Sequence, residues 1–219
     1  MTTLEELERR AARAGGAVGG AVLAAATRGV AAVRPARKPL HPDGSLVTGR
    51  IYRQGSETAT GVAWLDEAGE DEVVARLSRA VGLPTALPDI HGLAVRVHTQ
   101  DGYGDLLFAT TGRTRIGRFV LTPSRGSRDR PMTTLLPYDT ASGPLLVGAF
   151  ATGENTFALT WATPLGDWSQ FGVLILAGSH DDQEISFDPV RNQIEGLRQY
   201  AVVRRLREPA YATARSSRG

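Results

Sequence analysis

Short strand-like segments separated by turn residues dominate the sequence between residues 45 and 188, and they restrict the fold more than any other feature. Each is rich in Val, Ile, Leu, Thr, Phe or Trp; they are residues 45–52, 93–99, 105–110, 145–151, 156–161 and 172–176. Strands of this length and spacing are typical of antiparallel barrels and sandwiches. The sequence therefore predicts a barrel-like domain.

Two segments interrupt this series of strands. Residues 70–80 carry Val73, Val74 and Leu77 at helical spacing, which predicts a helix between the first two strands. Residues 124–131 are polar and rich in arginine, which predicts a surface loop. We therefore expect a mixed α+β domain.

The first 37 residues are expected to form a helical arm. Thr3 and Glu6 form a capping box, in which each side chain satisfies a backbone amide of the other residue. The apolar run at residues 17–26 is too short to span about 30 Å of hydrocarbon, and the acidic start is unlike a signal peptide. Packing of the arm on the domain or on a neighbouring subunit is the favoured interpretation. Peripheral membrane contact and homo-oligomerisation stay open.

The end of the chain also has a helical pattern. It covers residues 197–218 and contains Pro209. The expected fold class is therefore α+β, an antiparallel β-barrel with helical N- and C-terminal segments. Its two units are the arm at residues 1–37 and the barrel domain at residues 38–219.

The composition excludes several classes of function. The chain has no cysteine, so it forms no disulfide, thiolate metal site or cysteine nucleophile. The net charge of +2, without aromatic residues along a basic stripe, indicates no nucleic-acid partner. A cysteine-free chain without a signal peptide is compatible with the cytoplasm, which is the expected location. Of 25 basic residues only Lys38 is a lysine, and arginine favours fixed contacts with carboxylate or phosphate.

Common catalytic motifs are missing from the sequence. The 4 histidines are His41, His91, His98 and His180, and their spacing matches no compact zinc motif. The sequence contains neither a nucleophile elbow nor a phosphate-binding loop. Residue types alone leave open a haem-free hydrolase of the phosphodiesterase type, which would use His41, His91, Asp89 and Asp105. A non-catalytic barrel that binds a ligand is the other hypothesis.

Two segments in the first half of the domain resemble the haem catalase superfamily. Residues 89–106, DIHGLAVRVHTQDGYGDL, are similar without a gap to the catalase segment DxRGFAVKFYTxxGNxDL. Upstream, residues 38–44, KPLHPDG, resemble the catalase strand RVVHAxG, and Gly49 stands at the spacing of its second glycine.

Shorter matches follow in the order of the family. Residues 75–78, ARLS, are similar to VRFS. Residues 187–190, FDPV, with GL at 196–197, resemble FDPS…GI, and Arg207 and Tyr211 then form an Arg-x-x-x-Tyr motif. The resemblance implies a catalase-like antiparallel β-barrel.

The resemblance also implies haem b as cofactor and a peroxide or hydroperoxide as substrate. His41 matches the distal histidine, whose near-neutral pKa suits it to take and return a proton. Tyr211 matches the proximal ligand, whose phenolate binds the haem iron. Arg207, one helical turn earlier, would supply positive charge that favours ionisation of the phenol.

Further matches would surround these groups. Arg76 matches the arginine that binds a haem propionate, and Lys38 stands where the family has a second such arginine. Ser78 matches the partner that orients the distal histidine, here His41.

Departures from the family pattern bear on activity. Ala109 occupies the position of the distal asparagine and cannot donate a hydrogen bond to a peroxide oxygen, a loss worth about 10²–10³ in rate. The neighbouring Thr110 is expected to compensate in part. Pro209 lies between Arg207 and Tyr211 and has no N–H to donate to a helical hydrogen bond, which makes the one-turn geometry of that pair less regular. The expected function is therefore a haem-dependent peroxidase or hydroperoxide-metabolising oxidoreductase rather than a fast catalase.

Overall fold

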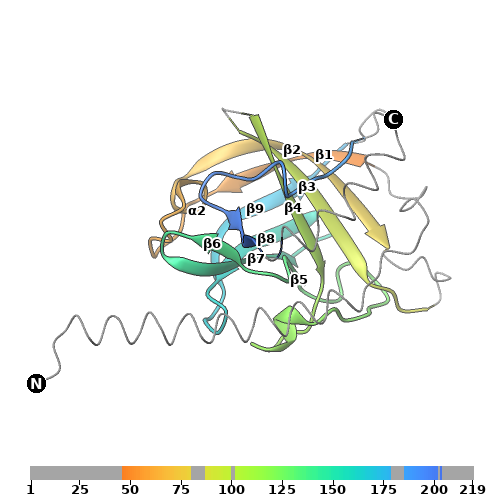
Figure 1. Cartoon of the computed structure of the whole chain (residues 1–219). Coiled ribbons are helices and arrows are strands. Elements are labelled where there is room, and N and C mark those ends of the chain that lie inside the picture. Colours follow the sequence, from red (N-terminus) through yellow and green to blue (C-terminus); the bar gives the residue numbers. More distant parts are fainter. Residues whose placement is uncertain (1–45, 80–86, 100–101, 179–184, 202, 204–219) are drawn as a thin grey trace, which may run out of the picture.

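The computed structural model describes residues 46–79, 87–99, 102–178, 185–201 and 203 (Figure 1). The predicted arm at residues 1–37 lies outside this part of the chain, as do Lys38, His41, Arg207 and Tyr211. Among the described residues, no helix is both long and apolar enough to cross a membrane.

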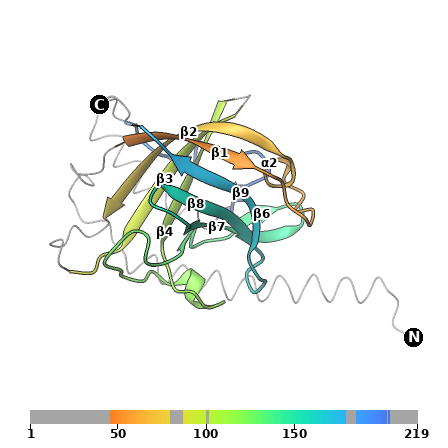
Figure 2. The same ribbon diagram turned by 180° about the vertical axis from the view of Figure 1, so that it is seen from behind.

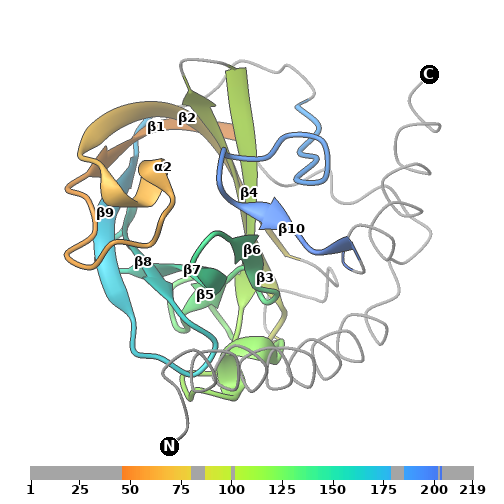
Figure 3. The same cartoon turned by 60° about the vertical axis from the view of Figure 1, so that its left-hand side comes forward.

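The strands form a closed antiparallel barrel. Within the described residues, 8 strands follow one another in the order β7-β5-β4-β3-β2-β1-β9-β8, and β8 pairs back with β7. Figure 3 shows these strands arranged round a ring. Their bounds are β1 Leu46–Arg53, β2 Gly69–Arg79, β3 His91–Thr99, β4 Gly102–Thr110, β5 Met132–Thr133, β7 Gly143–Ala151, β8 Thr156–Ala162 and β9 Ser169–Leu176.

Smaller elements attach to the outside and to the ends of this ring. β6 (Tyr138–Thr140) pairs with β7, and β10 (Arg198–Gln199) pairs with β6. α2 (Ala63–Asp66) lies between β1 and β2 in the chain, and a 3-10 turn covers Gly117–Phe119. The view from behind in Figure 2 shows β9 between β1 and β8.

The predicted barrel is confirmed, but the predicted helix at residues 70–80 is wrong. Residues 70–79 lie in β2, which pairs with both β1 and β3, and residue 80 lies outside the described residues. Val73 and Ala75 are buried on the inner face, while Glu70 and Glu72 are exposed, an alternation of period two. Valines at 73 and 74 and leucine at 77 satisfy a helical pattern equally well, so pairing with two neighbouring strands decides the conformation.

The predicted C-terminal helix at residues 197–218 is not confirmed. Residues 198–199 form strand β10 instead, and residues 201 and 203 are helical. The remainder of the predicted segment, from residue 204, lies outside the described residues. The arginine-rich loop at residues 124–131 contains no strand or helix longer than a single bridge, as predicted.

Side chains fill the inside of the ring. Leu93, Val95 and Val97 are buried on the inner face of β3, and the residues between them lie on the outer face. Phe157 and Phe171 are also fully buried in this core. An eight-stranded barrel is just wide enough for its own side chains, and each such residue contributes about 1.5–3 kcal/mol on burial. A ligand of organic size therefore has its place outside the ring.

A polar network fixes α2 against the barrel. Asp71 accepts hydrogen bonds from Arg53 Nε at 2.7 Å and from Trp64 Nε1 at 3.1 Å. Arg53 also donates to the Glu67 carbonyl at 2.7 Å, and the rings of Trp64 and Phe171 meet edge to face at 5.2 Å. Asp71 and Arg53 therefore serve the fold, because their charges satisfy each other.

Candidate functional site

The outer face of β2, β3 and β4 carries three of the residues that the resemblance singled out, Arg76, Ser78 and Ala109. The pairing register aligns Ser78 with Gly92 and Gly92 with Ala109. Directly opposed residues of antiparallel strands share a face, so these three residues form one row. The next row along the strands contains Arg76 and Ala94.

These rows make a face of small side chains with an arginine beside it. Ser78, Gly92, Ala94 and Ala109 are all half-buried. A Cβ atom added at Gly92 would lie 3.0 Å from Ser78 Oγ and 3.6 Å from the Phe108 carbonyl oxygen. A larger residue at position 92 would displace Ser78, so the sequence keeps this face shallow.

An ion pair on the same face anchors a distant segment. Arg96 donates to both carboxylate oxygens of Asp105, at 2.7 and 2.8 Å. Asp105 also accepts from the Asp188 backbone amide at 2.7 Å and from Asn192 Nδ2 at 2.8 Å. Arg96 donates to the Ser186 carbonyl at 2.7 Å. The segment around residue 188 is thereby fixed to β3 and β4.

The hydrogen bonds to Asp105 also act on the charge state of its partner. The hydrogen bond from Arg96 to Asp105 raises the pKa of Arg96 above its ordinary value, with burial opposing the shift and the charge of Asp105 adding to it. The contact with Asp105 therefore favours the charged form of Arg96.

Phe187 brings Arg76 and Arg96 to the same aromatic ring. The guanidinium carbon of Arg76 lies 5.3 Å from the centre of the Phe187 ring, and that of Arg96 lies 5.5 Å from it. Arg96 also lies 4.2 Å from the centre of the Tyr103 ring. Cation–π contacts at these distances fix Arg76 beside the small-residue face.

Thr110 does not reach this face. It is fully buried on the inner side of β4, and its Oγ1 accepts a hydrogen bond from the His91 amide at 3.1 Å. Successive residues of a strand point to opposite faces, so Thr110 and Ala109 lie on opposite sides of the sheet. The expected compensation for Ala109 by Thr110 is therefore wrong.

The residues of the hydrolase alternative do not come together in the described part. His91 is buried and bonded through Nε2 to the Ser124 carbonyl at 3.2 Å. Asp105 faces outward and pairs with Arg96, five residues along β3 from His91, or about 16 Å at the rise of a strand. Asp89 lies beyond His91, with Arg79 Nε 3.6 Å from its carboxylate. His41 lies outside the described residues.

Sequence reasoning missed the contacts around Asp105. Its partners are Arg96, Asp188 and Asn192. The last two lie more than 80 residues from Asp105 in the chain. The signal was present, since both residues 89–106 and 187–190 carried the resemblance. Nothing in either segment, however, indicates that the two touch.

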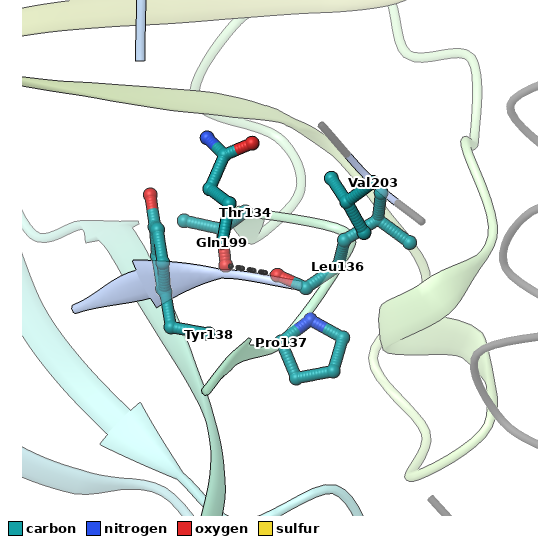
Figure 4. Close-up of a pocket in the computed structure, with 6 residues that line it drawn as sticks. All are labelled: Thr134, Leu136, Pro137, Tyr138, Gln199 and Val203. Atoms are coloured by element: carbon teal, nitrogen blue, oxygen red, sulfur yellow. Dashed lines mark hydrogen bonds between the residues drawn. The ribbon is translucent and has the colours of Figure 1, made fainter. Parts of the chain in front are cut away.

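Two hollows in the surface differ greatly in size. The smaller, about 10 Å³, is lined by Thr134, Leu136, Pro137, Tyr138, Gln199 and Val203, as Figure 4 shows. It has room for one water molecule, and the Gln199 Oε1 atom beside it has no hydrogen-bond partner. The larger, about 290 Å³, is lined by arginines and aromatic rings.

The comparisons with known proteins agree with this geometry at the level of the fold. No family model and no curated protein matches the sequence. A fungal catalase superposes with a TM-score of 0.54 at 11% identity, covering 78% of this chain and 57% of that one. Catalase A from Saccharomyces cerevisiae superposes with a TM-score of 0.57 at 10% identity, covering 84% of this chain and 62% of that one.

The fold is catalase-like. At these identities the likeness concerns the arrangement of the chain alone. The catalase-like chain spans less than two thirds of the length of either catalase.

The described side of the catalase-like barrel fits a flat macrocycle such as haem. The small residues leave a shallow face, the missing Cβ of Gly92 keeps it so, and Arg76 lies at its edge against the Phe187 ring. The axial ligand that the resemblance implies, Tyr211, lies outside the described residues. Within them, no group of three or more His, Asp or Glu side chains forms a metal cage.

Proposed function

We propose that this chain binds haem on the outer face of β2–β4 and metabolises a peroxide or organic hydroperoxide, as a peroxidase rather than a fast catalase. The observation that carries the proposal is the row of Ser78, Gly92 and Ala109 with Arg76 beside it. This row lies in a catalase-like fold and holds the positions that the sequence resemblance selected.

The cofactor would supply a ferric iron centre for cleavage of the O–O bond. Tyr211 would hold the iron through its phenolate, with Arg207 favouring the ionised form. Arg76 and Lys38 would bind the two propionates.

Proton transfer falls to His41. Its imidazole would accept a proton from the bound peroxide and return it to the departing oxygen, with Ser78 orienting the ring. Ala109 offers no hydrogen bond to the peroxide, and Thr110 lies on the other side of the sheet. Dismutation of hydrogen peroxide should therefore be slower by about 10²–10³ than with an asparagine donor.

The test begins with the absorbance spectrum of the purified chain titrated with hemin. We expect a Soret band that shifts on binding, and loss of that band in Tyr211→Phe. Tyr103→Phe, which removes the hydroxyl of an exposed tyrosine, is the matched control. The proposal is contradicted if hemin shows no Soret shift with the unmodified chain. It is also contradicted if the shift is the same in Tyr211→Phe and Tyr103→Phe.

Turnover separates the proposed peroxidase from a barrel that only binds a ligand. His41→Ala should keep the Soret band and lose peroxide consumption, and Ala109→Asn should raise hydrogen peroxide dismutation. One observation favours the second candidate function, a barrel that binds a ligand without catalysis. Ala109 offers no hydrogen-bond donor to a peroxide, and Thr110 does not replace it because its hydroxyl lies on the other face of the sheet. Hemin binding without turnover in the unmodified chain would support this second function.

A further inference from the structure

The larger cavity adjoins the row of small residues at Thr133, which pairs with Ala109, and it is of the size of a small-molecule site. Its volume is about 290 Å³, and it lies where the loop after β4 meets the ends of β5, β7 and the start of β9. The residues that line it are Gly112, Arg113, Arg128, Arg130, Pro131, Thr133, Phe150, Ala151 and Trp168.

No carboxylate neutralises the arginines of this cavity in the described part of the chain. Arg113 donates to the Asp129 carbonyl, and Arg130 donates to the Pro123 carbonyl, both at 3.2 Å. Arg128 is exposed and has neither a hydrogen bond nor an ion pair among the described residues. Three guanidinium groups therefore keep donors that an oxyanion could accept.

Asp129 and Asp167, which adjoin lining residues in the chain, already have partners. The Asp129 carboxylate accepts from the Gly126 amide at 2.7 Å. Asp167 pairs with Arg115 at 2.9 Å. Residues 113–130 contain 6 arginines and 1 aspartate, so the positive charge of the loop exceeds what its own carboxylate balances. The cavity is electropositive for this reason.

A buried fourth arginine adds to this charge. Arg118 is 3% exposed, its Nε has no hydrogen-bond partner, and its Nη1 donates to the Thr163 carbonyl at 3.3 Å. Burial, with the nearby charge of Arg115, lowers the pKa of Arg118 below its ordinary value, and the charge of Asp167 opposes this shift only in part. An anion in the adjoining cavity would offset this unbalanced charge.

Two aromatic rings complete the cavity. Trp168 and Phe150 meet edge to face with ring centres 5.1 Å apart, and the Arg118 guanidinium lies 4.5 Å from the Trp168 ring. These contacts hold the Trp168 ring in place before any ligand arrives. A ring already held in place loses little conformational entropy when a planar ligand packs on it.

We propose that this cavity binds a small planar organic anion, a ring that carries a phosphate or a carboxylate. The ring would pack on Trp168 and Phe150, and the oxyanion would accept hydrogen bonds from Arg113, Arg128 and Arg130. The proposal does not depend on haem.

Calorimetric titration of the full chain with phenyl phosphate tests this proposal. Inorganic phosphate and phenol carry the two halves of the probe, and each should bind about tenfold or more weakly than the whole, because charge and ring contacts add. Benzoate distinguishes a carboxylate site from a phosphate site. Binding of inorganic phosphate as tight as that of phenyl phosphate would overturn the part assigned to the rings.

Variants locate the binding within the loop. Arg128→Gln and Trp168→Leu should each lower the affinity for phenyl phosphate about tenfold. Trp168→Phe, which keeps an aromatic ring, should lose much less affinity than Trp168→Leu. Arg125→Gln removes the same charge from the same loop but at a residue that does not line the cavity, so it should bind as the unmodified chain does. Equal loss in Arg125→Gln and Arg128→Gln, or no binding at all, overturns the proposal. Tyr211→Phe should leave the affinity unchanged, which separates this site from the haem proposal.

Discussion

Arginine side chains in two regions of the molecule, strand β3 and the loop after β4, differ in what satisfies their charge. Arg96, on β3, meets a buried carboxylate in a two-point contact and fixes the segment around residue 188. Arg113, Arg128 and Arg130 on the loop after β4 meet carbonyls or no described partner. A charge that the protein itself satisfies stabilises the fold, whereas a charge that it leaves unsatisfied is available to a ligand.

The largest expected effect follows from breaking the satisfied charge. Asp105→Asn would leave Arg96 half-buried without its partner, and the free energy of unfolding should fall by about 3 kcal/mol or more. Urea denaturation of the full chain measures this change. Asp167→Asn removes the partner of an exposed arginine and should change stability by less than about 0.5 kcal/mol. Equal losses of stability in Asp105→Asn and Asp167→Asn would contradict the distinction between buried and exposed ion pairs.

A substitution on the small-residue face should affect one proposed site and spare the other. Gly92→Val would push on Ser78 Oγ and lower the free energy of unfolding by about 1–2 kcal/mol. Hemin affinity should fall, while phenyl phosphate affinity stays the same. The double variant Gly92→Val with Ser78→Ala should recover stability without recovering hemin binding. Full hemin affinity in Gly92→Val would place the cofactor elsewhere.

Replacing the buried, unpaired arginine should have a smaller effect. Arg118→Met removes a charge that burial destabilises, along with a cation–π contact and one hydrogen bond to a carbonyl. These changes oppose each other, so stability should change by less than about 1 kcal/mol. Arg96→Met is the comparison. It leaves the buried Asp105 carboxylate without its arginine, so it should clearly lower the stability measured by thermal denaturation. If the two variants lose the same stability, the distinction between the two groups of arginines fails.

The smallest effect concerns pH. Burial and then the charge of Asp139 raise the pKa of Tyr200, so the folded chain keeps this proton at a pH where the unfolded chain has lost it. Stability from Tyr200 is fully present below the ordinary tyrosine pKa of about 10 and is lost as the pH rises from there through the folded value. Denaturation between neutral and strongly alkaline pH should show this fall, and Tyr200→Phe should reduce it. Tyr103→Phe, at an exposed ring, serves as the control.

Strands were predicted well where one face is apolar and a turn follows. The segments at 93–99 and 156–161 lie within β3 and β8 because alternation and turn residues are local properties. β2 was mistaken for a helix because Val73, Val74 and Leu77 fit both periods, and only its two neighbours resolve the choice. The two-residue strands β5 and β10 carry no local pattern at all.

The candidate site was predicted as a set of positions and not as a set of contacts. Arg76 and Ser78 lie on one outer face, as alternation within a single strand requires. The same alternation explains why Thr110 does not compensate for Ala109, because neighbouring residues of a strand point to opposite faces. The cavity at Trp168 and Arg128 gave no signal in the sequence beyond an arginine-rich loop.

By itself, the sequence determined the barrel class, most of its strands, the likeness to catalases and the excess of arginine. Those properties are carried by alternation, turn residues and composition, which act within a few residues of the chain. Tertiary structure alone decided which arginines are neutralised and which are not, since Asp105 meets Asp188 and Asn192 only after the barrel has closed. Charge satisfaction depends on distance in space, and residues far apart in the chain set that distance.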